Sequence, residues 1–182
     1  AIGTGPLTLA LGAKLDHTSD QPVTLQPTIA HNWKDDWTYV GSASLNTGDG
    51  AITLGSSVVV VTVAGNTLEV GGAISDNGNA YKLVKAGNGT LALGADSYWT
   101  GGIQLDAGLL QLKTANGLGS GVFTISGSAS MDNLSGADMT LGGISSVMLP
   151  TSGTITYLGT SHSLDFGIAD VNQSGQGTKV LN

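Results

Sequence analysis

The chain has no cysteine and no arginine, and only 10% of its 182 residues are charged. The absence of cysteine excludes disulfides and thiolate metal sites. Phosphate recognition requires clustered cations, whereas this chain has a net charge of −7 and a pI near 4.4. We therefore expect no nucleic-acid partner, and an acidic surface that avoids anionic lipid headgroups. The six basic residues are scattered along the chain, at Lys14, Lys34, Lys82, Lys85, Lys113 and Lys179.

The chain also has no long hydrophobic run. A membrane helix needs about 20 consecutive apolar residues, and the longest apolar stretch, Val58 to Ala64, is interrupted by Thr62. We therefore predict no membrane insertion by this segment. A hydrophobic content of 40% is too high for a disordered chain. No basic-then-apolar leader follows Ala1, so we expect any export signal to have been removed or to lie outside this sequence.

What the chain does contain is short apolar runs, about ten residues apart, separated by turn-forming pairs such as Asn77-Gly78 and Asn88-Gly89. Glycine and asparagine tolerate the positive φ angles of tight turns. Short alternating runs of this kind predict strands, and no segment favours a helix. The predicted strands are Pro6–Leu9, Val23–Leu25, Thr38–Val40, Ile52–Leu54, Val58–Val63, Thr67–Val70, Tyr81–Val84, Thr90–Leu93, Ile103–Leu105, Leu109–Leu112, Val122–Ile125, Met139–Leu141, Val147–Leu149, Thr154–Leu158 and Ser163–Phe166.

Two all-β architectures fit many short strands at this spacing. One is an antiparallel sandwich or barrel. The other is a parallel β-helix, whose coils stack about 4.8 Å apart and bury their inward faces against each other. Aromatic residues make up only 5% of the chain, so we expect a narrow aliphatic interior. These features favour the β-helix, with eight or nine coils of roughly twenty residues in a rod about 40 Å long.

The segment from residue 87 to residue 121 resembles the autotransporter-associated β-strand repeat. The pattern of that family corresponds here to Gly87–Leu93, Tyr98–Gly102, Asp106–Leu112 and Asn116–Gly121, with a departure at Gly117. Proteins that carry the repeat are mostly exported bacterial surface chains built as right-handed parallel β-helices. The resemblance implies that this chain is a solenoid of the same hand on the cell surface or outside the cell.

The chain also aligns with itself. The segment from Ile2 to Leu25 can be laid on Leu118 to Leu141 at an offset of 116, which places Asp16 on Asp132. A repeat of this length spans several coils. We therefore predict a first long repeat unit at residues 1–116 and a second, truncated unit at residues 117–182, continuous with the first in one β-helix.

The most chemically mixed segment runs from His31 to Trp37. It supports a glycan contact by Trp33, Asp36 and Trp37, because a tryptophan face can stack on a sugar ring. The alternative is structural, since large aromatic side chains more often cover a core. Neighbouring strand residues point to opposite faces, so Asp35 and Asp36 cannot both serve one site if the segment is extended.

The remaining carboxylates do not form a recognisable catalytic pair. Most aspartates lie within two residues of Gly, Asn or Ser, where the side chain can bond to the backbone of a turn. We therefore assign no catalytic, cofactor or metal-binding residue, and expect no enzyme activity and no cofactor. The aspartates that we expect at turns are Asp20, Asp49, Asp76, Asp96, Asp106 and Asp138.

These observations predict a non-catalytic extracellular β-helix module, such as a stalk, fibre or adhesin segment of an exported bacterial surface protein. An uncovered sheet edge recruits further strands, so we expect self-association through the ends of the β-helix. Surface glycans, or the surface of a host or neighbouring cell, are further candidate partners. The competing hypothesis is a polysaccharide-binding or polysaccharide-cleaving β-helix protein.

Overall fold

The chain folds as a parallel β-solenoid, in a computed structural model that describes residues 3–26, 28–148, 154–158, 162–165, 171–172 and 178–180. About six turns of the solenoid are complete within this part of the chain. Every strand pair among the described residues is parallel, and no helix forms there. It follows that these residues contain no helix able to cross a membrane. The all-β parallel prediction is confirmed, and the antiparallel sandwich is excluded.

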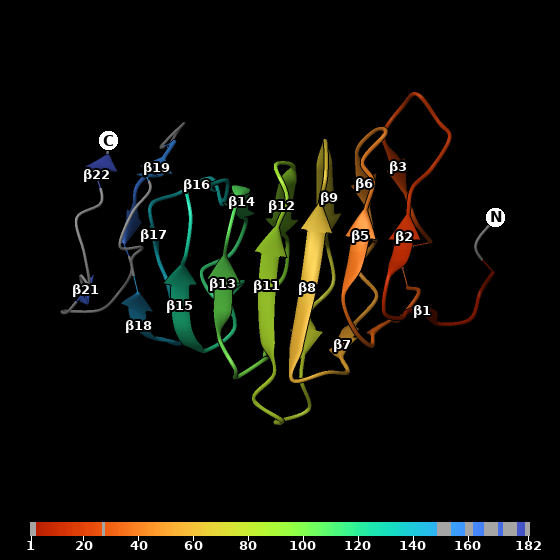
Figure 1. The fold of residues 1–182 in the computed structure, drawn as a ribbon, viewed down its shortest axis with the longest axis horizontal. Helices are drawn as coiled ribbons and strands as arrows, with labels where there is room; N and C mark the ends of the chain where they lie inside the picture. Colours follow the sequence, from red (N-terminus) through yellow and green to blue (C-terminus); the bar gives the residue numbers. More distant parts are fainter. Residues whose placement is uncertain are drawn as a thin grey trace.

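The strands form two eight-stranded sheets, a four-stranded sheet and a two-stranded sheet. Figure 1 shows the first long sheet in front, with its strands side by side along the axis, and the second long sheet behind it. The first long sheet contains β2 (Ala13–Leu15), β5 (Trp37–Tyr39), β8 (Val58–Val63), β11 (Lys82–Ala86), β13 (Ile103–Leu105), β15 (Gly121–Ile125), β18 (Ile144–Met148) and β21 (Val171–Asn172). The second long sheet contains β3 (Val23–Thr24), β6 (Leu45–Asn46), β9 (Thr67–Val70), β12 (Thr90–Leu93), β14 (Gly108–Leu112), β16 (Ala129–Asn133), β19 (Thr154–Tyr157) and β22 (Thr178–Val180).

A third side of the solenoid is less regular. It begins with the four-stranded sheet, which ends at β10, and a separate pair of strands lies further along the chain. The four-stranded sheet contains β1 (Leu7–Leu9), β4 (His31–Trp33), β7 (Ile52–Leu54) and β10 (Ile74–Ser75), and the pair is β17 (Met139–Thr140) with β20 (Leu164–Asp165). Loops therefore replace strands on this side between β10 and β17.

Pairing register sets the length of each coil. Trp37 pairs with Val61, which is 24 residues later, whereas Leu83 pairs with Ile103, only 20 residues later. The spacing between strands is fixed by backbone hydrogen bonds, so the loops between sheets absorb these differences in length.

The core consists of columns of side chains that point inward at the same position of successive coils. One column in the second long sheet joins seven strands, and each of its members pairs with the next in register. Burying each of the leucines in it contributes about 2 kcal/mol. The column consists of Val23, Leu45, Leu68, Leu91, Leu110, Met131 and Tyr157.

The interior also holds aromatic side chains, although the low aromatic content predicted a narrow aliphatic core. Trp33, Tyr39, Trp99 and Phe123 are all fully buried. They replace aliphatic residues inside the coils, because the interior is wide enough for a ring at these positions.

The long internal repeat is not in phase with the coils. An offset of 116 places β1, in the four-stranded sheet, on β15, in the first long sheet. The division of the chain at residue 117 therefore stays a prediction. One local likeness does follow the alignment near Tyr39 and Tyr157: each hydroxyl donates to a nearby backbone carbonyl at a turn.

Candidate functional site

The two tryptophans of the predicted glycan contact lie in the core. Trp33 is the last residue of β4 and Trp37 the first of β5, and their exposed fractions are 0% and 2%. Their ring centroids are 5.1 Å apart in an edge-to-face arrangement. No ring face is open to a sugar, so the prediction of stacking on Trp33 and Trp37 is wrong and its structural alternative holds. The hydrophobic gain from burying both rings explains this position.

Asp36 joins neighbouring coils. Its Oδ1 atom accepts a hydrogen bond of 2.7 Å from the backbone N–H of Val60, and its carbonyl accepts one of 2.8 Å from the N–H of Gly12. Asp35 caps the preceding bend, because its carboxylate accepts the N–H of Asp36 at 2.9 Å. The two carboxylates therefore serve the backbone, and they do not converge with the tryptophans on one site.

His31 is buried beside this pair of rings. It is 1% exposed, and its Nε2 atom lies 3.3 Å from the carbonyl oxygen of Thr47. Because a carbonyl only accepts, Nε2 carries the proton; Nδ1 is buried and has no hydrogen-bond partner. Burial lowers the pKa of His31, and the hydrogen bond to Thr47 opposes that shift. The neutral ring is thus the form that the fold favours.

Lys85 is a charged residue in an inward column. It lies in register between Val61 and Leu105, and its exposed fraction is 0%. Its Nζ atom donates to the carbonyl oxygens of Ala86, Gly87 and Ala107 at 3.0, 2.7 and 3.0 Å. Burial lowers its pKa to about 8, against the opposing charge of Asp106. The ammonium group closes the turns of two successive coils.

Aspartates stabilise turns, as the sequence predicts. Asp76 is fully buried, and its carboxylate accepts N–H groups from Gly78, Tyr81 and Thr100 at 2.9, 3.1 and 2.8 Å. Burial raises the pKa of Asp76, but hydrogen bonds from Thr100, Gly78 and Tyr81 outweigh it, and the net pKa is lowered. Asp138 similarly accepts the N–H of Ser163 at 2.8 Å, which lowers its pKa.

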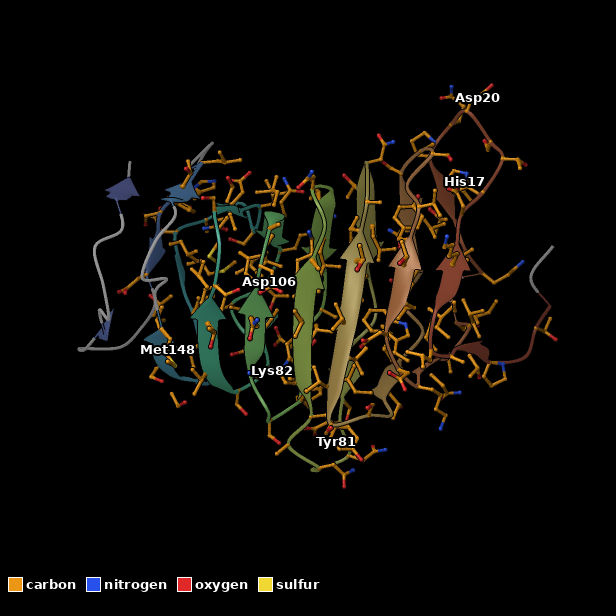
Figure 2. All side chains as sticks on the ribbon, viewed as in Figure 1. His17, Asp20, Tyr81, Lys82, Asp106 and Met148 are labelled. Carbon is orange, nitrogen blue, oxygen red and sulfur yellow. The ribbon has the colours of Figure 1, made fainter. Side chains whose placement is uncertain are left out.

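The carboxylates of the described residues are separated among turns of different coils. Figure 2 shows Asp20 on the loop that projects between β2 and β3, far from Asp106. No group of three or more His, Cys, Asp or Glu side chains among the described residues could hold a metal ion.

A surface groove lies where loops replace strands beyond β10. It has a volume of about 390 Å³ and crosses three successive loops, which precede β13, β15 and β18. Backbone hydrogen bonds continue across it: Tyr98 N–H donates to Ile74 at 2.7 Å, and Ser120 N–H donates to Trp99 at 2.9 Å. The lining residues are Asp96, Ser97, Tyr98, Thr100, Asn116, Gly119, Ser120 and Gly143.

Glycines make the floor of this groove. A Cβ atom on Gly119 would lie 2.5 Å from the carbonyl oxygen of Trp99, and one on Gly143 would lie 2.7 Å from that of Gly119. Both residues have positive φ angles, of 64° and 78°. Close stacking of the loops thus excludes side chains from the floor, which leaves the groove open.

Sequence reasoning missed the groove. The segment around Tyr98 matches the aromatic element of the repeat, but nothing in the sequence separates Tyr98 from its neighbour Trp99. The structure does: Trp99 is 0% exposed and donates from Nε1 to Gly102, whereas Tyr98 is 68% exposed. Alternation along an extended segment would have been the available signal.

Comparison with known proteins gives no assignment. The chain matches no protein-family model, no curated protein and no solved structure. The autotransporter-repeat resemblance therefore stays a prediction.

Proposed function

We propose that this chain is a non-catalytic structural module of an exported bacterial surface protein, a stalk or fibre segment that acts on the cell surface or outside the cell. The observation that supports this role most directly is the uninterrupted inward column from Val23 to Tyr157, which joins coil to coil along the axis. A column of this kind produces a stiff, elongated body. The described carboxylates and histidines stabilise turns and core, as expected of a scaffold.

The proposal includes the finer architecture. Each long sheet contains eight strands, which supports a count of eight coils, within the predicted eight or nine. Right-handed coiling is proposed from the autotransporter-repeat resemblance. A far-reaching rod of this design would place a binding region away from the cell surface.

Self-association through the ends is the second part of this proposal. The strands β2 and β3 each have a neighbour on one side only. The inward side chains of this first coil, Leu7, Leu15 and Val23, are only partly buried, whereas their partners in later coils are fully covered. Unpaired strand edges and part-exposed apolar side chains favour the addition of another coil.

Sedimentation velocity over a range of concentrations tests this proposal. We expect particles to grow in length with concentration, and a Leu15→Lys variant to remain monomeric because a charge cannot enter the apolar contact. As a matched control, Lys14→Glu changes an exposed side chain of the same strand and should leave association intact. A wild-type chain that stays monomeric at every concentration would contradict end-to-end association.

The location of the parent protein needs a separate test. Antibody raised against this chain should label intact cells that produce it, and external protease should remove the label. Label that appears only after cell lysis would contradict the surface assignment.

A further inference from the structure

Tyr98 is exposed beside a groove that has no cationic lining residue among those described. Apolar side chains of this size are usually covered, so a 68% exposed ring at a concave surface points to binding. Its backbone is fixed by the hydrogen bond from its N–H to Ile74, at 2.7 Å. The buried Trp99 next to it holds the loop in place. The exposed ring is thus presented by a rigid support.

Polar groups lie within the same groove, and they are already oriented. The Asp96 carboxylate accepts hydrogen bonds from the hydroxyl of Thr114 and from Nδ2 of Asn116, the second at 3.2 Å. A carboxylate can accept further bonds, and an asparagine amide can both donate and accept. These are the partners that sugar hydroxyls require, because each hydroxyl both donates and accepts.

The floor matches a flat ligand. Gly119 and Gly143 carry no side chain, and close stacking of the coils prevents one from being added. A pyranose ring has one face rich in C–H groups and hydroxyls around its rim. A ring stacked on Tyr98 would therefore extend over the glycine floor and place hydroxyls at Asp96 and Asn116.

Charge decides between classes of sugar. Asp96 adds a negative charge to the lining, and the whole chain has a net charge of −7. A uronic acid or sulfated sugar would be repelled. We propose that the groove at Tyr98 binds a neutral oligosaccharide of hexose units. This site is independent of the scaffold role, and it differs from the glycan contact predicted at Trp33, Asp36 and Trp37.

Binding is tested with cellohexaose, mannohexaose and maltohexaose, and with hexagalacturonate as the acidic comparison, by saturation-transfer NMR and calorimetry. At least one neutral hexasaccharide binds the wild type, and Tyr98→Ala weakens that affinity about tenfold or more, because a stacked aromatic contributes roughly 1–2 kcal/mol. Tyr98→Phe keeps the ring and binds like the wild type. Ser120→Phe fills the groove and abolishes binding.

Leu11→Ala is the matched control, since Leu11 is 72% exposed and does not line the groove. It should bind like the wild type. The proposal is overturned if no neutral hexasaccharide binds, if Tyr98→Ala binds as tightly as the wild type, or if hexagalacturonate binds more tightly than every neutral sugar. Sedimentation of Tyr98→Ala should match that of the wild type, so loss of glycan binding is distinguishable from failure of the scaffold proposal.

Discussion

Lys85 shows at the residue scale how a polar group is accommodated in a narrow core. Its aliphatic stem occupies an inward position between Val61 and Leu105, and its ammonium group reaches three backbone carbonyls at the turn. Long basic side chains commonly bury the stem and satisfy the charge at its end. Here the end of the side chain meets carbonyl oxygens of the protein in place of water.

Replacing Lys85 with methionine should lower the free energy of unfolding by about 2–4 kcal/mol. Methionine fills a similar volume, so the loss comes from carbonyl oxygens that no longer receive charge-assisted hydrogen bonds. Urea unfolding measures the change. Lys14→Met, at an exposed position, should be neutral within about 0.5 kcal/mol. Equal stability of the two variants would contradict the role of the ammonium group.

His31 should make the fold sensitive to mild acid. Its folded pKa lies below the ordinary value of 6.5, so the unfolded chain takes up the proton first as the pH falls. The stability that neutral His31 supplies is complete above pH 6.5 and is lost as the pH decreases below it. Thermal unfolding at about pH 8 and about pH 5 should show a smaller loss for His31→Gln than for the wild type.

The result for His31→Gln is judged against its own stability at the higher pH, where both chains lack a charge at residue 31. If variant and wild type lose the same stability on acidification, other groups account for the pH dependence.

The sequence predicts residue types at turns better than it predicts which side chains are exposed. Asp76 and Asp138 bind turn backbone as expected, because a short carboxylate beside Gly, Asn or Ser reaches nearby N–H groups. Trp33 and Trp37 are compatible with either a surface or a core in sequence. Burial was decided by coil stacking, which brings β4 against β1 and β7.

At the scale of elements, the loop between β10 and β11 depends on one side chain. Asp76 accepts bonds from both ends of this loop and from Thr100 in the next coil. Figure 2 shows Tyr81 where the loop projects from the solenoid. Asn77 and Ala80 have positive φ angles, of 53° each, and this conformation needs external support.

Asp76→Ala should destabilise the fold by about 2–3 kcal/mol, since several buried N–H groups lose their acceptor. Protease should cut within residues 76–81 sooner than in the wild type. Limited proteolysis followed by mass spectrometry locates the cut. Asp20→Ala, on an exposed loop, is the comparison and should alter neither stability nor the first cleavage site.

Strands with alternating aliphatic residues were predictable, and polar strands were not. The predicted ranges of β7, β8, β9, β12 and β13 match the structure residue for residue. The strand β4, His-Asn-Trp, and the strand β16, Ala-Ser-Met-Asp-Asn, were missed. Their extended form comes from pairing with strands of the coils above and below, which local sequence does not encode.

For the whole molecule, sequence evidence was enough to choose parallel coils over a closed sandwich. Short strands, abundant glycine and a low content of charge suit either architecture, and the likeness to a repeat family decided between them. The alternation of coil lengths could not be predicted, because it is set by loops such as those around Tyr98. The groove was missed for the same reason.

A solenoid built this way should tolerate removal of one complete coil. Deleting the 24 residues from Thr38 to Val61 joins Trp37 to Thr62 in register. We expect a folded chain with an unchanged circular dichroism spectrum per residue and a smaller dependence of unfolding free energy on urea, because less surface is exposed. Deleting residues 38–49 removes half a coil, shifts inward side chains outward and should abolish folding.

The register between coils has a mechanical consequence. When the two ends of the rod are pulled apart, tension acts along the direction of the hydrogen bonds that join successive strands, so the bonds open one row after another. Each detached coil of 24 residues, as between Trp37 and Val61, would release roughly 80 Å of slack. A surface protein containing this segment would lengthen in steps under shear and keep its attachment while the remaining coils stayed wound.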